Sequence, residues 1–332
     1  MLSFRFLIIP DKADTMLEKQ ERGIAMDTYS FNDAIAQSSV SCTFPGLEAV
    51  SVFGGDDLAD CESVLFPGCS FINYAMPLMQ SVYELLVDAG QVDGISLLCC
   101  GEILGYEGDG GALRAAYEQQ FREHIAKTKI KRIVTACPNC PPSLRKILAA
   151  DEATADIEVV PLPRVLADLG YRIDPTSAEE LLRQNGDLPD GEEPVFCPKD
   201  SCPDRSRGEY ADALRELMSE TNLVEPKFAR KRSYCCGSRP RAVGHFELAN
   251  KQACRNGVHA REVGANVIVT ACVNCSFSLV AFQNEVPVYH YLELLFNWRI
   301  PWYLAEGYIK LRFLFDDAEA NRSSRDYKGL DS

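Results

Sequence analysis

The chain has 332 residues, of which 46% are hydrophobic and 25% charged, the proportions of a soluble globular protein with room for two domains. Its net charge of −14 argues against binding to nucleic acid or an anionic membrane surface, because both would repel it, whereas a basic partner would suit it. No stretch approaches the roughly 18–20 apolar residues of a membrane-spanning helix, and residues 4–10 are too short for a signal-peptide core, so we expect a cytoplasmic protein that is not integral to the membrane.

Residues 1–60 form an N-terminal extension without a recognisable motif. The domain that follows, 61–175, alternates short apolar runs with amphipathic stretches, which is the βαβ pattern of a parallel sheet. Strands are predicted at 63–66, 95–98 and 132–135, and helices at 72–89 and 112–128. The predicted strands lead into cysteines: Cys69, then the adjacent pair Cys99 and Cys100, then Cys137 and Cys140.

An acidic segment with two glycines, 176–193, is predicted to link this domain to a second one at 194–302. The second domain repeats the arrangement of the first. Strands are predicted at 194–196, 232–234 and 267–270, and they lead to Cys202, to the pair Cys235 and Cys236, and to Cys272 and Cys275. Residues 303–332 form a polar C-terminal tail.

The two domains are predicted to be copies of one ancestral unit. Residues 134–144 and 269–279 agree at eight of eleven positions, and a Cys-Cys-Gly triplet precedes each of them. From the second cysteine of the triplet to the first of the CxxC, 36 residues intervene in one copy and 35 in the other. Chance is very unlikely to produce the same order and spacing of cysteine motifs twice in one chain. The predicted fold class is therefore α/β, with two tandem Rossmann-like βαβ repeats and parallel sheets, related by duplication.

Fourteen cysteines are the strongest chemical signal in the sequence. In a reducing compartment they indicate metal ligands or redox groups, while scattered buried thiols are the alternative. Because the carboxyl ends of parallel strands meet at one edge of a sheet, cysteines about thirty residues apart can converge there. An isolated CxxC would leave zinc or a thioredoxin-type pair open, but each repeat offers five cysteines and a tetrahedral zinc ion takes four ligands.

The Cys-Cys-Gly and CxxC motifs at these positions resemble the CCG cysteine-rich domain family, and most closely its heterodisulfide reductase B subunits. The resemblance covers residues 60–302. It implies two iron–sulfur clusters of the [4Fe–4S] type, expected to be noncubane, with zinc as the alternative at one site. It also implies that the metal-binding and catalytic residues are Cys69, Cys99, Cys100, Cys137 and Cys140 in the first repeat and Cys202, Cys235, Cys236, Cys272 and Cys275 in the second.

The resemblance further implies an enzyme subunit, an oxidoreductase acting on the sulfur group of a small disulfide. Electrons would come from a ferredoxin-like iron–sulfur subunit and a flavoprotein subunit. The alternative is a non-catalytic electron-transfer subunit of a dehydrogenase for lactate, glycolate, glycerol-3-phosphate or succinate, because relatives of that kind share the motifs.

Other residues carry weaker signals. Cys42 and Cys61 are expected to be structural or incidental, Cys254 to lie in a helix core, and Cys197 to be either core or a spare ligand. Five charged residues near the second motif are interpreted as solvated or capping side chains, with contact to an anionic substrate or proton donation as the alternative: Lys199, Arg205, Arg239, Arg241 and His245.

Overall fold

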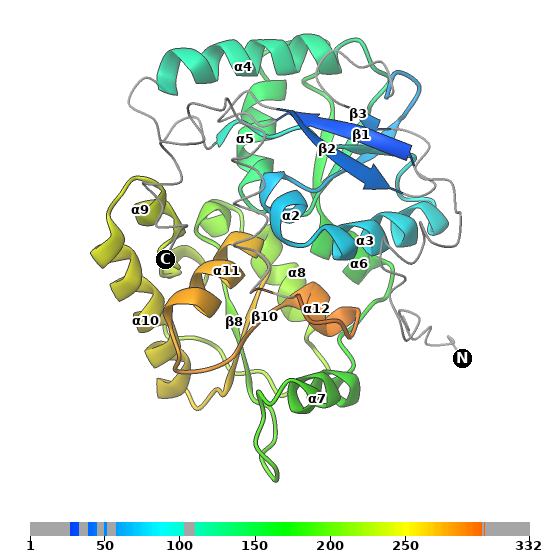
Figure 1. The fold of residues 1–332 in the computed structure, drawn as a ribbon. Helices are drawn as coiled ribbons and strands as arrows, with labels where there is room; N and C mark the ends of the chain where they lie inside the picture. Colours follow the sequence, from blue (N-terminus) through cyan, green and yellow to red (C-terminus); the bar gives the residue numbers. More distant parts are fainter. Residues whose placement is uncertain are drawn as a thin grey trace. The chain divides into compact units, whose positions relative to one another are not determined.

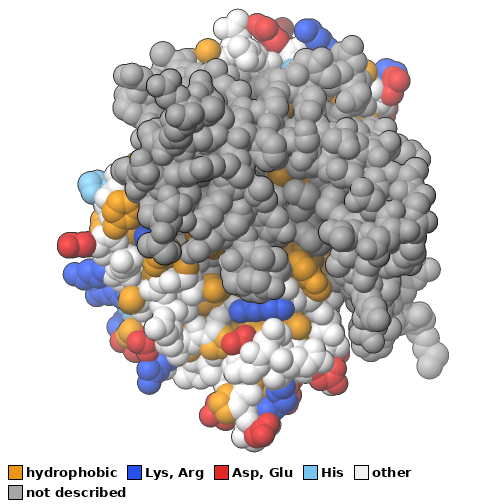
Figure 2. All heavy atoms as spheres, in the orientation of Figure 1, with side chains coloured by type: hydrophobic (Ala, Val, Ile, Leu, Met, Phe, Trp, Pro, Cys, Tyr) orange, Lys and Arg blue, Asp and Glu red, His pale blue; other side chains and the backbone are white. Residues whose placement is uncertain are grey.

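The computed structural model describes residues 27–32, 39–44, 50–51, 58–102, 110–300 and 302. These residues fall into two compact units that divide between Leu162 and Pro163. Among them, no helix has both the length and the apolar character needed to cross a membrane. The face of the second unit drawn in Figure 2 mixes acidic, basic and apolar side chains.

The first unit contains a five-stranded parallel sheet (Figure 1). Its strand order is β3 (Val50–Ser51), β5 (Gly94–Ser96), β4 (Ser63–Phe66), β6 (Arg132–Thr135) and β7 (Glu158–Pro161). The helices of this unit are α2 (Cys69–Tyr74), α3 (Met76–Asp88), α4 (Gly110–Ile125) and α5 (Cys140–Leu148). The predicted N-terminal extension supplies β3 and an antiparallel pair, β1 (Asp27–Asn32) and β2 (Ser39–Phe44).

The second unit contains a three-stranded parallel sheet in the order β8 (Phe196–Lys199), β9 (Val267–Thr270), β10 (Val288–His290). Its helices are α6 (Leu162–Asp168), which begins one residue before the division, α7 (Pro175–Gln184), α8 (Glu209–Leu217), α9 (Ser238–Ala242), α10 (Phe246–Glu262), α11 (Val273–Phe282) and α12 (Tyr291–Leu295). Two short 3-10 turns, η2 (Cys202–Ser206) and η3 (Arg230–Arg232), complete it. The segment predicted as the linker contains most of α7.

The two sheets share the layout that duplication predicts. Strands β4, β6 and β7 of the first unit correspond in order and direction to β8, β9 and β10 of the second. The register matches as well, because Phe66 lies opposite Thr135 and Lys199 lies opposite Thr270. Phe66 and Lys199 therefore occupy equivalent positions, three residues before the first motif cysteine of each repeat.

The strand predicted at 232–234 is wrong. In its place the backbone forms η3, with Arg230 in the left-handed region at φ 55°. Three consecutive basic side chains cannot be buried in a sheet, so this segment stays at the surface. Besides its pairing with β9, strand β8 makes an isolated parallel bridge between Phe196 and Leu223.

The helix predicted at 72–89 is divided in two. Helix α2 begins at Cys69 itself and ends at Tyr74, and α3 starts at Met76 after Ala75 leaves helical geometry. Pro77 explains the break, because proline has no N–H to donate and is tolerated only in the first turn of a helix. The strands predicted at 63–66, 132–135 and 267–270 are confirmed with the same bounds.

Candidate metal centres

Each unit brings its five motif cysteines together at the carboxyl edge of its sheet. In the first unit Cys69 begins α2, the adjacent pair follows β5, Cys137 follows β6, and Cys140 begins α5. The second unit repeats this arrangement, except that Cys235 and Cys236 follow an irregular segment instead of a strand. All five positions of each repeat therefore converge as the sequence predicts.

Within each unit the five thiols contact one another in a continuous series. In the first unit, hydrogen bonds connect them in the order Cys69, Cys99, Cys100, Cys140, Cys137. In the second unit the order is Cys202, Cys235, Cys236, Cys275, Cys272. The two orders are identical when the repeats are aligned, so the duplication preserves the pattern of side-chain contacts as well as the fold. We call these the first and second thiol series.

Backbone groups hold the adjacent pair of each series in the same way. The N–H of Gly101 donates to Cys99 Sγ at 3.4 Å, and the N–H of Gly237 donates to Cys235 Sγ, also at 3.4 Å. Both glycines have positive φ, 73° and 98°, which side chains with a Cβ rarely adopt. The glycine of each triplet therefore serves to turn an N–H group back onto a sulfur atom.

Two serines missed by the sequence analysis support the same loops. Ser143 Oγ donates to the carbonyl of Cys100 at 2.8 Å, and Ser278 Oγ donates to the carbonyl of Cys236 at 2.9 Å. Both lie three residues after the second cysteine of a CxxC. They are among the eight matching positions of the repeat, so the alignment of the copies contains the signal that could have identified them.

The other carbonyl of each adjacent pair is held by a different residue in each repeat. Tyr117 of α4 donates its hydroxyl to Cys99 O, and Asn256 of α10 donates Nδ2 to Cys235 O at 2.9 Å. One role is thus filled by two unrelated side chains. Sequence comparison of the repeats gives no signal for either of them.

One thiol in each series is favoured as a thiolate. Hydrogen bonds from Cys140 and Cys99 lower the pKa of Cys100 to about 6, although burial acts in the opposite direction. In the second unit, hydrogen bonds from Cys202 and Cys236 hold the pKa of Cys235 far below that of an ordinary thiol. Thiolates are the form of cysteine that binds metals, so both series are prepared for that chemistry.

A buried lysine distinguishes the second series from the first. Lys199 is 8% exposed, and its Nζ donates to Asp200 O at 2.7 Å. Burial acts to lower the pKa of Lys199, but four thiol groups outweigh it and raise that pKa: those of Cys275, Cys236, Cys202 and Cys235. At the equivalent position the first unit has Phe66, which carries no charge.

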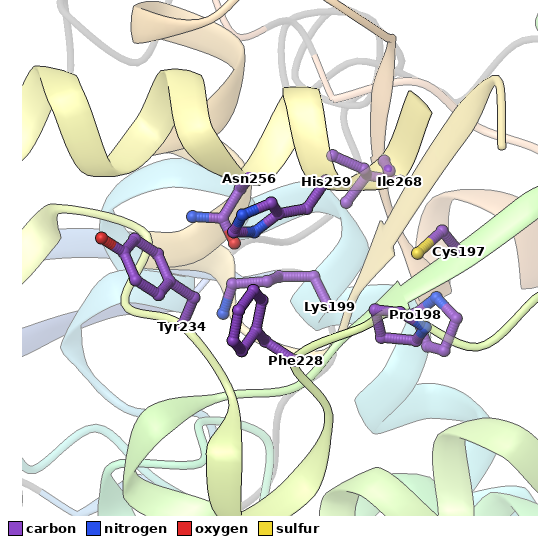
Figure 3. A pocket seen from close by; sticks show the side chains of 10 residues that line it. Cys197, Pro198, Lys199, Phe228, Tyr234, Asn256, His259 and Ile268 are labelled. Carbon is purple, nitrogen blue, oxygen red and sulfur yellow. The ribbon is translucent and has the colours of Figure 1, made fainter. Parts of the chain in front are cut away.

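The lysine lines a pocket beside the second series. In Figure 3 its side chain runs from β8 past Phe228 towards Tyr234, the residue before Cys235. The rings of Phe228, Tyr234 and His259 contact one another, with centroids 4.7 to 6.2 Å apart. The pocket thus contains an aromatic cluster and an ammonium group, and the ammonium group interacts with thiols of the second series.

The two series differ in exposure as well. Cys99 is buried, while the equivalent Cys235 is partly exposed. Cys69 and Cys202, the first cysteines of the two motifs, are both partly exposed. The second series therefore reaches the surface at two adjacent members, whereas the first does so at one end only.

The chemistry of the donors indicates which metal groups each series suits. In the described ranges, no three His, Cys, Asp or Glu side chains converge closely enough to hold one metal ion as they stand. Each series offers five thiol donors, each in contact with the next. Soft thiolate ligands suit iron–sulfur clusters and zinc, and a cluster of several irons can accept more than the four ligands of a zinc ion.

The remaining cysteines lie outside the two series. Burial raises the pKa of Cys61 to about 11 and that of Cys197 to about 12, so both remain protonated thiols in their cores. The prediction that Cys254 lies in a helix core is wrong: it belongs to α10 but is exposed, and its Sγ donates to Phe282 O at 3.3 Å. Cys42 is in β2, and its side chain lies outside the described residues.

Two arginines near the second motif, Arg205 and Arg241, have local partners. Arg205 Nε donates to Ser233 O at 3.1 Å, which fastens η2 to the segment before Cys235. Arg241 lies over the Phe282 ring, 3.4 Å from its centroid. Arg239 and His245 are exposed.

A comparison with protein families matches the CCG cysteine-rich domain twice, at residues 63–145 and 200–280, and these segments contain the two thiol series. A search of curated proteins finds no match to the chain.

Among solved structures, the chain is similar to Picrophilus torridus aspartate racemase, at 14% identity over 75% of this chain and 94% of that chain, with a TM-score of 0.31. It is also similar to glutamate racemase from Francisella tularensis (12% identity, 71% and 78% covered, TM-score 0.33). A hypothetical protein from Helicobacter pylori gives 10% identity, 75% and 49% covered, and a TM-score of 0.39. Similarities this weak say nothing about the reaction.

Proposed function

Because the chain belongs to the CCG cysteine-rich domain family through both of its halves, we propose that it is an iron–sulfur subunit of an oxidoreductase complex that reduces a disulfide. Domains of this family are found in iron–sulfur subunits of oxidoreductases. The observation that supports the proposal is the presence of two complete thiol series with the same order of contacts. A structural role would not require five cysteines in each copy.

The residues proposed to hold the metal are the ten members of the two series. Each set of five is proposed to hold a [4Fe–4S] cluster of the noncubane type, with zinc as the alternative at one site. When bound, such clusters supply one-electron transfer between a partner and a substrate. The protein residues fix the sulfur atoms, neutralise charge through Lys199 and support the loops through Ser143 and Ser278.

The proposed substrate is a small disulfide, which takes up two electrons and two protons and yields two thiols. The electrons are proposed to come from a ferredoxin-like iron–sulfur subunit, itself supplied by a flavoprotein subunit. The partly exposed Cys202 and Cys235 support access from outside at the second series.

The burial of most motif cysteines supports a second candidate function. Seven of the ten motif cysteines are buried, which suits a subunit that relays electrons without binding a substrate. In that case the chain would serve a dehydrogenase for a hydroxy acid, glycerol-3-phosphate or succinate. The two candidates share the metal sites and differ in whether a substrate sulfur reaches them.

The first measurement is the metal content of anaerobically purified protein. We expect about eight irons per chain, four for each series, as [4Fe–4S] clusters require. Stoichiometric zinc with little iron would rule out both candidates. Adding small thiols to the oxidised, iron-loaded protein then separates them. A change in the electron paramagnetic resonance spectrum with at least one thiol of a panel supports disulfide reduction, and no change with any of them favours the relay.

A further inference from the structure

The two copies have opposite charge around their adjacent cysteine pairs. From eight residues before the first cysteine of the pair to twenty after it, the second copy (227–255) has eight Lys and Arg and one Glu, a net charge of +7. The equivalent window of the first copy (91–119) has one Arg and five acidic residues, a net charge of −4. The whole chain has a net charge of −14 and the window of the second copy has +7, so the residues outside that window carry a net charge of −21.

Most of these positive charges are at the surface. The exposed Lys and Arg residues of the window are Lys227, Arg230, Lys231, Arg232, Arg239, Lys251 and Arg255. Of Lys227, Arg230, Lys231, Arg232, Lys251 and Arg255, the structure describes an ion pair with an acidic side chain for Arg230, which pairs with Asp212. The remaining charge therefore acts on whatever approaches this side of the second unit.

Apolar side chains lie among the charges. Of the six large hydrophobic residues that are exposed in the described part of the chain, four lie between residues 243 and 258. Leu248 and Val258 are 47% and 40% exposed and share one stripe of α10 with Lys251 and Arg255, since these positions recur at helical spacing. Figure 2 shows Lys and Arg side chains at the margin of the second unit where α10 lies in Figure 1.

This stripe adjoins the second thiol series. The Arg255 guanidinium donates to Tyr234 Oη at 3.4 Å and lies 5.5 Å from the Tyr234 ring centroid. Tyr234 directly precedes Cys235, which is partly exposed. The basic turn η3 ends two residues before Tyr234. We call the exposed residues of η3 and this stripe, together with Lys227, the basic face.

We propose that the basic face is the docking site of a small acidic iron–sulfur protein of the ferredoxin type, and this rests on the function proposed above. An apolar patch with a charged rim is the usual composition of a specific protein interface. The six Lys and Arg side chains of the basic face attract an acidic partner, while the net negative charge of the residues outside the window disfavours its binding elsewhere, so that charge selects this one orientation. Docking here brings the partner next to Cys235.

The charge distribution favours a compact acidic protein over a nucleic acid. A nucleic acid is an extended polyanion and would run from the basic face onto the acidic remainder of the surface, where it is repelled. A small protein can be confined to the face. In each productive encounter one electron passes from the reduced partner, which is oxidised, to the chain, which is reduced, with no bond made and no proton moved.

The test uses the full-length, iron-loaded chain and a small acidic ferredoxin with two [4Fe–4S] clusters. Its first readout is the dissociation constant, measured by calorimetry. We expect the affinity to fall at least tenfold between about 20 mM and about 200 mM ionic strength, because the contact is electrostatic. The double variant Lys231→Glu with Lys251→Glu should lose at least tenfold in affinity at low salt. Leu248→Ser should weaken binding at all salt concentrations.

A matched control is available in the first unit. Arg122→Glu with Lys127→Glu makes the same change in net charge and should alter the affinity less than twofold. The second readout is the rate of reduction by the ferredoxin, which should fall in the basic-face variant while reduction by dithionite is unchanged. Dithionite is small and does not need the docking face.

Several results would overturn the proposal. The first is that the basic-face variant binds the ferredoxin as tightly as the wild type does. The second is that the control variant loses as much affinity as the basic-face variant. The third is that single-stranded RNA binds more tightly than the ferredoxin and that the basic-face variant abolishes this RNA binding. A large fall in melting temperature in the variant without a change in ferredoxin binding would show that the face is covered by the chain itself. A chain that holds no iron would refute the proposed function. Ferredoxin binding would still test the basic face in that case, because the face is formed by residues of the chain and not by the iron.

Discussion

Lys199 is the residue at which the two copies differ most in their electrostatics. Its ammonium group is buried beside four thiol groups, while the equivalent Phe66 places a neutral ring at the same position of the sheet. A charge acts most strongly on its neighbours where water is excluded. The equivalent cysteines of the two series therefore lie in different electrostatic environments.

This difference predicts unequal reduction potentials. Reduction adds negative charge next to sulfur atoms that already carry it, and Lys199 offsets part of that charge in the second unit. In Lys199→Met, the potential of the second centre should fall by on the order of 60 mV, which corresponds to a tenfold change in a one-electron equilibrium. Potentiometric titration followed by electron paramagnetic resonance measures it.

The control is Lys227→Met, which removes an exposed lysine of the same unit. It should leave both potentials within experimental error of the wild type, because water screens its charge. The first centre should be unaffected in either variant. An unchanged second potential in Lys199→Met, or an equal shift in both centres, would show that the lysine does not act locally.

At the scale of residues, the sequence predicts which cysteines come together better than it predicts the side chains that support them. The convergence of all ten cysteines could be predicted because the duplication repeats their spacing after the strands. Tyr117 and Asn256 could not be found in this way, since any donor of suitable length can satisfy a carbonyl group. Lys199 was interpreted as a solvated charge because the sequence does not show that β8 is buried.

At the scale of elements, the turn at Gly237 controls how closely the second series approaches α10. A Cβ at Gly237 would lie 2.4 Å from the carbonyl oxygen of Ala249, which belongs to the helix backbone. In the first unit a Cβ at Gly101 would meet the ring of Tyr117 at 2.8 Å. Helix backbone cannot move aside as a side chain can, so the second turn is the less tolerant of the two.

Gly237→Ala should therefore destabilise the second unit strongly. Strain at φ 98° and the clash with Ala249 together cost about 2–5 kcal/mol. Gly264→Ala is the matched control, since Gly264 also has positive φ, 81°, but no atom within 4 Å of the added Cβ. The control should cost about 1–2 kcal/mol. Chemical denaturation measures both, and a similar cost in the two variants would contradict the role of the close approach.

Helices and strands were predicted correctly where the apolar runs were continuous. The predictions failed where a proline or a run of charged residues interrupted the pattern. Strands β4, β6 and β9 have uninterrupted apolar cores and kept their predicted bounds. The helix at 72–89 was predicted from its apolar content without regard to Pro77. The strand at 232–234 was inferred by analogy with the first copy, although its basic residues are incompatible with a buried position.

At the scale of the whole molecule, duplication has preserved the two thiol series while the residues around them diverged. Each unit contributes a complete thiol series from its own elements. The sheets differ in strand number, and the charge around the adjacent pairs has reversed in sign. This combination is expected if both centres are required but only one of them receives a partner.

The independence of the two units leads to the last prediction. All five members of the first series lie before Leu162, and all five of the second lie after Pro163. A serine hydroxyl is a much poorer ligand for iron than a thiolate, so one substitution should disable one site only. Cys100→Ser should lower the iron content from about eight to about four per chain, and Cys236→Ser should do the same.

The spectra should show that different centres are lost in the two variants, and the double variant should hold almost no iron. Cys61→Ser and Cys197→Ser are the matched controls, one in each unit, because both remove a buried thiol that lies outside the series. They should keep the full iron content, which also tests whether Cys197 is a spare ligand. If either single variant lost all of its iron, the two series could not be separate sites, and a single centre held jointly by both units would have to replace them.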